Sequence, residues 1–459
     1  MDINNTPKQE IKRIAEQQRK FFREGKTLDI DFRKNALHML KKALKEHEAE
    51  IATALWQDLH KCYEEAYMTE LSIVLGEIDN HLNNLSRWSR PKHVCTPLKM
   101  FPSRSKIISE PLGCSLIIAP WNYPVQLLLN PLVGAISSGC TAILKPSPYV
   151  PHVSLALERL IKDTFNEEYI AIVQGNREVN ASLLEERYDI IFFTGSPQLG
   201  RMVMRAAAEN LTPVVLELGG KSPCIIDKDA NIAMAAKRIA WGKSLNAGQT
   251  CIAPDYLLVH RDVKQALVTA LKKEFSNLLG ENPKEAKHFV RIVNQKAYKR
   301  LVGYFKDGDI VMGGDCDESE RYISPTIIDN VSPDSPVMTE EIFGPMFPIQ
   351  TFTSTQDAVD FVTSREKPLA LYYFGNKGIK EMLKHTSSGG ACINDTIMHI
   401  ANERLPFGGV GSSGMSSYHG KESFKVFSHR RAVVTTTTLL DLPFRYMPYT
   451  FFKWIKGLL

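Results

Sequence analysis

The chain has 459 residues, 44% of them hydrophobic, and a formal net charge of +5. This length allows two or three domains with a sizeable core, and the modest charge without a basic block gives no reason to expect nucleic acid as a partner. The eight cysteines are scattered without a C-x-x-C pair and the histidines are dispersed, so we expect no zinc ribbon, disulfide framework or metal site. Reduced thiols in the cytoplasm fit this cysteine usage best.

The N-terminal part of the chain is polar at first and then helical. Residues 1–10 lack the apolar core of a signal peptide. Over residues 31–89, leucines and isoleucines recur at three-to-four spacing between lysines and glutamates, which predicts a helical scaffold. We interpret His60, Lys61 and Cys62 within it as surface or packing residues.

The middle of the chain alternates short apolar runs with helical runs. Before it, three prolines and several basic residues at 91–104 predict an extended connector. In a first unit we predict strands at 114–119, 142–144, 170–173, 190–193 and 214–216, and helices at 126–138, 153–165 and 197–209. In a second unit we predict strands at 223–226, 257–259 and 369–374, and a helix at 264–279. Such alternation predicts parallel sheets with crossover helices, an α/β fold. Gly219 and Gly220, a possible turn or hinge, mark the boundary between the units.

The C-terminal part differs in composition. The threonine-rich run 433–440 predicts an exposed or edge strand. Residues 442–459 are aromatic and basic, with too many breaks and charges for a membrane span. Their aromatic residues are Phe444, Tyr446, Tyr449, Phe451, Phe452 and Trp454. We favour a tail packed over the protein, because a proline-interrupted segment makes a poor helical stripe. Contact with a membrane surface is the alternative.

Two segments concentrate reactive groups. Cys251 follows a helical run that Gly248 breaks, and Pro254 rules out a helix directly after it. A thiol on such a kinked connection is held by its neighbours yet accessible, as a nucleophile requires; a buried structural cysteine is the alternative. Upstream, Glu217 interrupts an apolar strand. It is either a satisfied strand-end residue or a general base whose pKa is raised by apolar surroundings.

Six motifs in this chain resemble those of the aldehyde dehydrogenase family and occur in the family's order. They are PWNYP at 120–124, KPS at 145–147, LELGGKSP at 216–223, NAGQTCIAP at 246–254, EIFGP at 341–345 and PFGGVGSSG at 406–414. The resemblance covers nearly the whole chain. The segment GSSGMSSYHG at 411–420, together with the short N-terminal part, is similar to the class 3 branch, which takes fatty and aromatic aldehydes.

The resemblance implies oxidation of an aldehyde to its carboxylic acid. A thiolate at Cys251 would form a thiohemiacetal oxyanion, stabilised by the side-chain amide of Asn122 and the backbone N–H of Cys251. Glu217 would then activate water to hydrolyse the resulting thioester. Without the motif, Asn122 would be interpreted as a turn residue between two prolines.

The resemblance also implies NAD or NADP as the cofactor, although the G-x-G-x-x-G fingerprint is missing from any strand–helix context. Gly195 and Ser196 end a predicted strand and begin a helix that contains Gly200. Backbone and hydroxyl donors at such a helix N-terminus favour phosphate. By itself, a Gly-Ser turn between strand and helix is common.

Further cofactor contacts are implied by position in the motifs. Lys145 is similar to the family's ribose-binding lysine, and Glu341 to the glutamate that holds the nicotinamide ribose, with Phe343 beside it. Trp121 belongs to the same expected set. Without the other motifs, Lys145 would be a solvated lysine and Glu341 a capping glutamate.

One residue departs from the family pattern. Many members that prefer NAD carry a glutamate three residues after the ribose-binding lysine, where it repels a 2′-phosphate, whereas this chain has Pro148. We therefore expect NADP to be accepted.

The implied architecture assigns residues 1–90 and 105–218 to a Rossmann-type cofactor-binding domain and 219–414 to a catalytic domain. A bridging or oligomerisation element comprises 91–104 and 415–441, followed by the tail 442–459. We expect a homodimer. Tyr123, Phe407 and tail aromatics are expected to line the substrate pocket, with the tail near its mouth, which favours a medium- or long-chain aliphatic or an aromatic aldehyde.

Three alternatives stay open. The chain could be a semialdehyde dehydrogenase of narrow specificity. It could be a cofactor-independent thiol acyl hydrolase or acyltransferase that activates Cys251 with a histidine, for which His419 is the nearest motif candidate. A non-enzymatic protein on a retired fold ranks last, because Cys251, Glu217 and Asn122 are all present.

Overall fold

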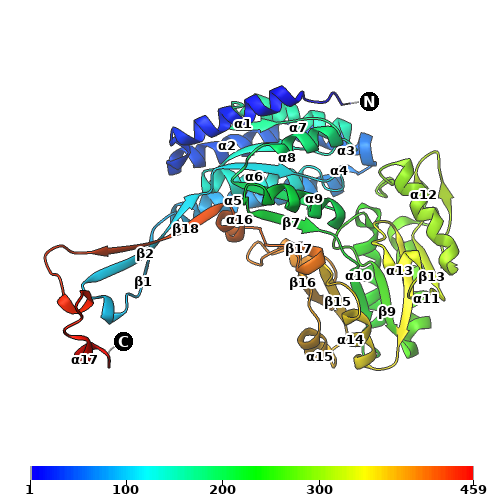
Figure 1. Ribbon diagram of the computed structural model, residues 1–459. Coiled ribbons are helices and arrows are strands. Elements are labelled where there is room, and N and C mark those ends of the chain that lie inside the picture. The colour runs from blue at the N-terminus through cyan, green and yellow to red at the C-terminus, as the bar shows by residue number, and fades with distance from the viewer. Residues whose placement is uncertain (1–2, 458–459) are drawn as a thin grey trace.

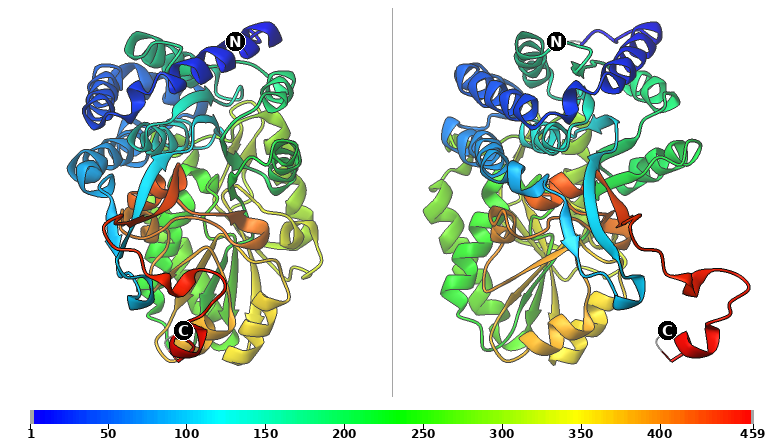
Figure 2. Two further views of the ribbon diagram at one scale, coloured as in Figure 1. Left: turned by 60° about the vertical axis from the view of Figure 1, so that its left-hand side comes forward. Right: turned by 90° about the vertical axis from the view of Figure 1, so that its left-hand side faces the viewer.

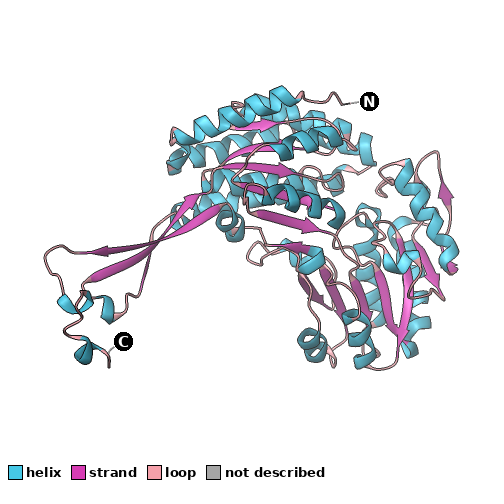
Figure 3. Cartoon of the chain, viewed as in Figure 1, coloured by secondary structure: helices cyan, strands magenta, loops and turns pink. Residues whose placement is uncertain are grey.

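A computed structural model describes residues 3–457, except the side chains of residues 444, 454 and 455. Two open sheets covered by helices form the body of the molecule, and a narrow sheet projects from it (Figure 1, Figure 3). The prediction of an α/β fold is confirmed.

The first sheet has six strands in the order β17–β7–β6–β3–β4–β5. The strands are β3 (Cys114–Ile118), β4 (Thr141–Lys145), β5 (Ile170–Ile172), β6 (Ile190–Gly195), β7 (Val214–Leu218) and β17 (Gly414–Met415). All neighbours are parallel except β17, which runs antiparallel to β7. Four helices connect them: α6 (Gln126–Ser138), α7 (Pro151–Thr164), α8 (Arg177–Glu185) and α9 (Pro197–Ala208). β3 and β4 are buried along their whole length, as strands of a parallel sheet covered on both faces are.

The second sheet has seven strands in the order β10–β13–β14–β9–β8–β15–β16. They are β8 (Pro223–Ile226), β9 (Tyr256–His260), β10 (Asp309–Met312), β13 (Thr326–Asp329), β14 (Met346–Phe352), β15 (Ala370–Phe374) and β16 (Gly390–Ile393). Only β10 pairs antiparallel. Its helices are α10 (Ile232–Ser244), α11 (Lys264–Leu279), α12 (Gln295–Gly303), α13 (Pro336–Thr339), α14 (Thr355–Thr363) and α15 (Ile379–His385). A separate two-stranded sheet joins β11 (Cys316–Asp317) to β12 (Tyr322–Ile323).

Helices of the N-terminal part lie beside the first sheet (Figure 1). They are α1 (Lys8–Arg23), α2 (Ile30–Glu46), α3 (Glu48–Leu59), α4 (Tyr63–Ala66), a π-helical turn (Tyr67–Leu71) and α5 (Ser72–Trp88). The predicted helical scaffold breaks after Leu59, where His60 adopts a left-handed conformation with φ 54°. We did not predict α1, whose mostly polar sequence buries only a narrow face.

The prediction of an extended connector at 91–104 is wrong. β1 (Lys92–Val94) and β2 (Ser103–Pro111) form an antiparallel pair, and β18 (Ser428–Thr436) pairs with the whole of β2. This three-stranded sheet projects from the body, and we call it the arm (Figure 1). The expected boundary at 104 and 105 falls inside β2, and the strand predicted at 433–440 begins and ends earlier. Between β17 and the arm, α16 (Lys421–Val426) packs on α6.

The prediction that the tail packs over the body of the same chain is also wrong. Thr436, the last residue of β18, pairs with Ser103 at the outer end of the arm, so the chain continues away from the body. Beyond it, α17 (Phe452–Ile455) lies near that end (Figure 2), and Leu439 and Met447 are 95% and 79% exposed. The predicted aromatic contacts of Phe444 and Trp454 lie outside the described side chains. Among the described residues, no helix has the length and apolar character needed to cross a membrane.

Candidate active site

Cys251 lies on a kinked connection, as predicted. α10 ends at Ser244 and is followed by a short turn in which Asn246 and Ala247 take left-handed conformations, with φ 51° and 50°. Gly248 is also left-handed, with φ 70°. Cys251 as a residue is partly exposed, whereas the residues on either side of it are buried. This connection therefore fixes the cysteine without covering it.

The electrostatics around Cys251 keep its thiol protonated at rest. Burial raises the pKa of the thiol well above its ordinary value, and the carboxyls of Glu341 and Glu217 raise it further. The backbone N–H groups of Cys251 and Ile252 point at the sulfur and act in the opposite direction. These two groups are the donors available to a thiolate once the proton has left.

Glu217 lies in β7, opposite Gly414 of β17. Its side chain is buried, and among the described residues neither carboxyl oxygen has a hydrogen-bond partner. Burial alone raises the pKa of this carboxyl well above its ordinary value. Of the two interpretations made from the sequence, a satisfied strand-end residue does not fit, because an unpartnered buried carboxyl costs free energy.

Asn122 joins its own loop to the connection that carries Cys251. Its side-chain Nδ2 donates to the backbone carbonyl oxygen of Gln249 at 3.1 Å. The backbone carbonyl oxygen of Asn122 accepts from Asn246 Nδ2 at 2.9 Å. A primary amide has two N–H donors, so one remains for another acceptor. Next to it, Tyr123 hydrogen-bonds Thr250 through the two hydroxyl oxygens, 2.7 Å apart.

Glu341 lies against the glycine pair that follows β7. The N–H of Gly220 donates to its carboxylate, and a β-carbon added at Gly219 would lie 2.0 Å from its Oε2 atom. Burial, reinforced by the negative charge of Asp255, raises the pKa of Glu341 to about 8. Among the described residues, Oε1 has no hydrogen-bond partner. Glycine is therefore required at position 219 for this carboxylate to approach.

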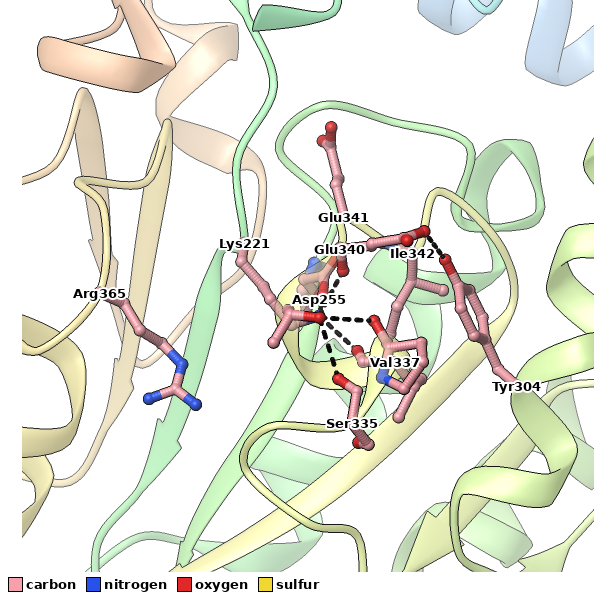
Figure 4. Close-up of polar contacts among 12 residues, drawn as sticks. Lys221, Asp255, Tyr304, Ser335, Val337, Glu340, Glu341, Ile342 and Arg365 are labelled. Atoms are coloured by element: carbon pink, nitrogen blue, oxygen red, sulfur yellow. Dashed lines mark hydrogen bonds and ion pairs between the residues drawn. The ribbon is translucent and has the colours of Figure 1, made fainter.

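A polar cluster holds the loop that carries Glu341, and its members were not identified from the sequence. Lys221 forms an ion pair with Asp255 and donates to the carbonyl oxygens of Val337 and Glu340 at 2.7 and 2.9 Å. Asp255 in turn accepts the N–H of Ile342 at 2.9 Å. Figure 4 shows this cluster, with the Glu341 side chain directed away from it.

A signal for this cluster does exist in the sequence. Lys221 and Asp255 directly follow the glycine pair and the segment CIAP, so opposite charges occur next to two motifs. Which loop they support depends on the tertiary fold.

The predicted phosphate-binding turn connects β6 to α9. Ser196 caps α9, and its hydroxyl accepts the N–H of Leu199 at 3.4 Å. Gly195 is the last residue of β6. A β-carbon at Gly200 would lie 2.7 Å from Leu218, so glycine lets the helix approach β7 closely. The turn leaves donors at a helix N-terminus as predicted.

The other residues predicted to bind the cofactor lie at two separate positions, one at the end of β4 and one where two aromatic rings meet. Lys145 ends β4 and is buried, not solvated; its Nζ donates to the carbonyl oxygen of Pro146 at 2.7 Å, and burial lowers its pKa to about 8. Trp121 and Phe343 contact each other edge-to-face, with ring centroids 5.4 Å apart. Phe343 has a left-handed backbone with φ 54°, which is costly for an aromatic residue and typical of functional loops.

Phe407 lies beside Tyr418, a residue that is close to Glu217 and Cys251. Its backbone bridges that of Tyr418, and its ring stacks on His419 at 5.2 Å. The pKa of Tyr418 is raised well above its ordinary value by burial and by the Glu217 and Cys251 groups, which places the ring close to both. His419 adjoins Phe407 and Glu77, whereas the groups that act on the Cys251 thiol are the two carboxyls.

Comparison with known proteins places this site in a family. The sequence profile described as "Aldehyde dehydrogenase family" matches residues 1–433. The chain is 48% identical to a 4,4′-diaponeurosporen-aldehyde dehydrogenase of Staphylococcus aureus, with 95% of this chain and 96% of the relative aligned. It is 44% identical to the dimeric NADP-preferring aldehyde dehydrogenase of Rattus norvegicus, over 92% and 93% of the two chains.

A solved structure agrees with this assignment. The substrate-bound state of Staphylococcus aureus AldH superimposes with a TM-score of 0.96 at 46% identity, covering 98% of this chain and 99% of the other. Since the family profile and these relatives match nearly the whole chain, the chain belongs to the aldehyde dehydrogenase family, whose members oxidise aldehydes with NAD or NADP.

Proposed function

We propose that Cys251 is the nucleophile of this aldehyde dehydrogenase, Glu217 the base that activates water, and Asn122 an oxyanion donor. One observation carries the proposal: a buried carboxyl without a hydrogen-bond partner in the described structure acts electrostatically on a thiol at the end of a strained connection. Unpartnered buried groups with shifted pKa values are characteristic of catalytic sites.

In the proposed sequence, the Cys251 thiol first gives its proton to water, and the thiolate then adds to the aldehyde carbon. The free N–H of the Asn122 amide and the backbone N–H of Cys251 then face the new oxyanion, a contribution of typically about 10²–10³ in rate per donor. Oxidation of this adduct leaves a thioester on Cys251. Glu217, as the carboxylate, removes a proton from water that attacks the thioester and releases the acid.

The residues predicted to hold the cofactor fit a dinucleotide. Glu341 presents a buried carboxylate oxygen without a partner, which suits the hydroxyls of a ribose, and the ammonium of Lys145 has donors beyond the one given to Pro146. The α9 N-terminus beside Ser196 suits a phosphate. When bound, NAD or NADP supplies the two-electron acceptor of the oxidation.

NADP is proposed as an accepted cofactor. Pro148 is partly exposed and adds no negative charge near a 2′-phosphate. The rat relative carries "NADP-preferring" in its name, which supports the same expectation.

The proposed substrate is a medium- or long-chain aliphatic or an aromatic aldehyde. Aromatic side chains lie next to the reactive groups: Tyr123 is bonded to Thr250, the neighbour of Cys251, and Phe407 pairs with Tyr418, which is close to Glu217 and Cys251. The Staphylococcus aureus relative is named for diaponeurosporen-aldehyde, which supports an apolar substrate. A short semialdehyde carries a carboxylate at the end opposite its aldehyde group, and a site for it would need a cation to bind that carboxylate.

We also propose that the protein is a cytoplasmic homodimer in which each part of the chain has a separate function. The first sheet and its helices form the cofactor-binding domain, and the arm forms the dimer contact. The catalytic domain, expected to span 219–414, then ends at 413, because Gly414 belongs to β17 of the first sheet. The arm is a narrow sheet with an exposed strand at one edge and a partly exposed one at its centre, and a relative is named dimeric. All eight cysteines are free, which suits a reducing compartment.

The test is cofactor reduction by the purified protein with short, long-chain and aromatic aldehydes, using NAD and NADP separately. We expect turnover with apolar aldehydes that Cys251→Ala abolishes. Turnover confined to a semialdehyde would favour the narrow-specificity alternative. Aldehyde-independent ester hydrolysis without dinucleotide binding would favour a thiol hydrolase instead.

A further inference from the structure

We propose that Lys61 and Glu70 are positioning residues for the oxyanion donor Asn122. The inference rests on the proposed role of Asn122, and it assigns a function to two charged groups that the mechanism above does not use. Both side chains are completely buried, and Nζ of Lys61 lies 2.7 Å from Oε1 of Glu70. From the sequence we interpreted Lys61 as a surface or packing residue, and its ion pair was not identified.

Lys61 reaches the loop at Asn122 itself. Its Nζ donates to the carbonyl oxygen of Asn122 at 3.2 Å, and it lies 4.3 Å from the centroid of the Tyr123 ring. A second donor, Nδ2 of Asn246, meets the same carbonyl at 2.9 Å. The backbone on which the Asn122 amide depends is therefore fixed from two sides, by the ammonium and by the connection that carries Cys251.

Glu70 holds the other end of the same loop. Its Oε2 accepts the N–H of Val125 at 2.9 Å and that of Gln126 at 3.1 Å. These N–H groups lie at the start of α6, where a helix has no intrahelical acceptors for them. Lys61 and Glu70 thus contact the loop on the two sides of Tyr123, and their mutual ion pair fixes the distance between the two contacts.

The local backbone places both groups. Lys61 follows the left-handed residue His60 that ends α3, and Glu70 lies in the π-helical turn 67–71. π-Helical turns are rare and occur frequently at functional sites. Between them, Glu65 accepts the N–H of Asn246 at 2.8 Å, so the same segment also contacts the Cys251 connection.

The free-energy cost of burying the Lys61–Glu70 ion pair indicates that the pair has a role in positioning Asn122. Removing two charges from water is expensive, and well-packed apolar residues of similar size are often as stabilising as a buried ion pair. A fixed position for Asn122 does have catalytic value, because a displacement of about 1 Å can cost about 10²-fold in rate.

The test is a double-mutant cycle between the pair and Asn122. Lys61→Met with Glu70→Leu removes both charges together, so neither is left buried alone. We expect this variant to fold and bind NAD and NADP within about 2-fold of wild type, but to lose about 10–10²-fold in kcat, the range expected for a misplaced donor. In an Asn122→Ala background the same pair of changes should cost less than about 3-fold more, since the group they position is already gone.

A matched control is Arg33→Met. Arg33 is a buried cation that donates to the carbonyl oxygens of Thr27, Leu28 and Ser137 at 2.6, 3.1 and 3.3 Å, and it contacts none of the residues proposed for catalysis. It should lose stability but keep kcat. An equal loss of kcat with and without Asn122 would overturn the positioning role alone. Full activity of Asn122→Ala itself would overturn the proposed function of Asn122, and the positioning role with it.

Discussion

Gly248 and Gly344 lie back to back: a β-carbon added at Gly248 would be 2.3 Å from the carbonyl oxygen of Gly344. Gly248 precedes Cys251 by three residues, and Gly344 belongs to the loop that carries Glu341. The approach of these two backbones therefore sets the separation between the nucleophile and the carboxylate proposed to hold the nicotinamide ribose.

We predict that Gly248→Ala destabilises the protein. Its φ of 70° is unfavourable for alanine, and the added carbon would clash with a backbone oxygen that cannot turn away. Thermal unfolding should show a decrease of several degrees, corresponding to about 2 kcal/mol or more. Gly303→Ala is the control, because a β-carbon there meets nothing within 4 Å. If both variants unfolded at the wild-type temperature, the close approach of the two glycines would be wrong.

The raised pKa of Glu341 predicts a pH-dependent stability. Its carboxyl binds a proton more tightly in the folded state, with a pKa of about 8, than at its ordinary value of 4.5 in the unfolded chain. The stabilisation is therefore fully present below about 4.5 and is lost as the pH rises to about 8.

Glu341→Gln removes this proton-binding site. Without cofactor, the variant should gain stability relative to wild type between pH 5 and pH 8.5, measured by thermal unfolding. Glu168→Gln, at an exposed carboxylate, should show no such trend. A constant difference between Glu341→Gln and wild type across this range would contradict the raised pKa.

Pro148 gives a prediction about cofactor choice. Pro148→Glu should lower kcat/KM with NADP by about 10-fold or more and change that with NAD little, because a carboxylate repels a 2′-phosphate at short range. Tyr149→Glu places the same charge one residue further on, at a half-exposed position, and should discriminate less. Equal effects of Pro148→Glu on both dinucleotides would show that this residue does not face the 2′ position.

The reactive groups could be identified from the sequence, because each interrupts a local pattern. Cys251 follows a broken helix, and Glu217 stands in an apolar strand; the structure has both features. The five first-unit strands and three helices that were predicted likewise lie close to their observed positions, since their apolar runs are bounded by turns, whereas α8 and β17 were not predicted. Helix α6 begins and ends at the predicted residues 126 and 138.

The remaining features depend on distant segments. Ser103 and Thr436 are bonded across 333 positions of the chain, so neither the arm nor the direction of the tail follows from local periodicity. Lys61 looks like any surface lysine in a helical run, and its burial depends on Glu70 and Asn122 meeting it in space. For the same reason, the support of Glu341 by Lys221 could not be predicted from the sequence.

The most direct test of the central claim is the intact mass of Glu217→Gln after mixing with an apolar aldehyde and NAD or NADP. Loss of the base should slow thioester hydrolysis by about 10²–10⁴-fold, so one equivalent of reduced cofactor should form in a burst. The protein mass should increase by one acyl group on Cys251, and the increase should be absent from the double variant with Cys251→Ala. Wild-type steady-state turnover by Glu217→Gln, or an acyl group bound elsewhere, would contradict the proposed roles of these two residues.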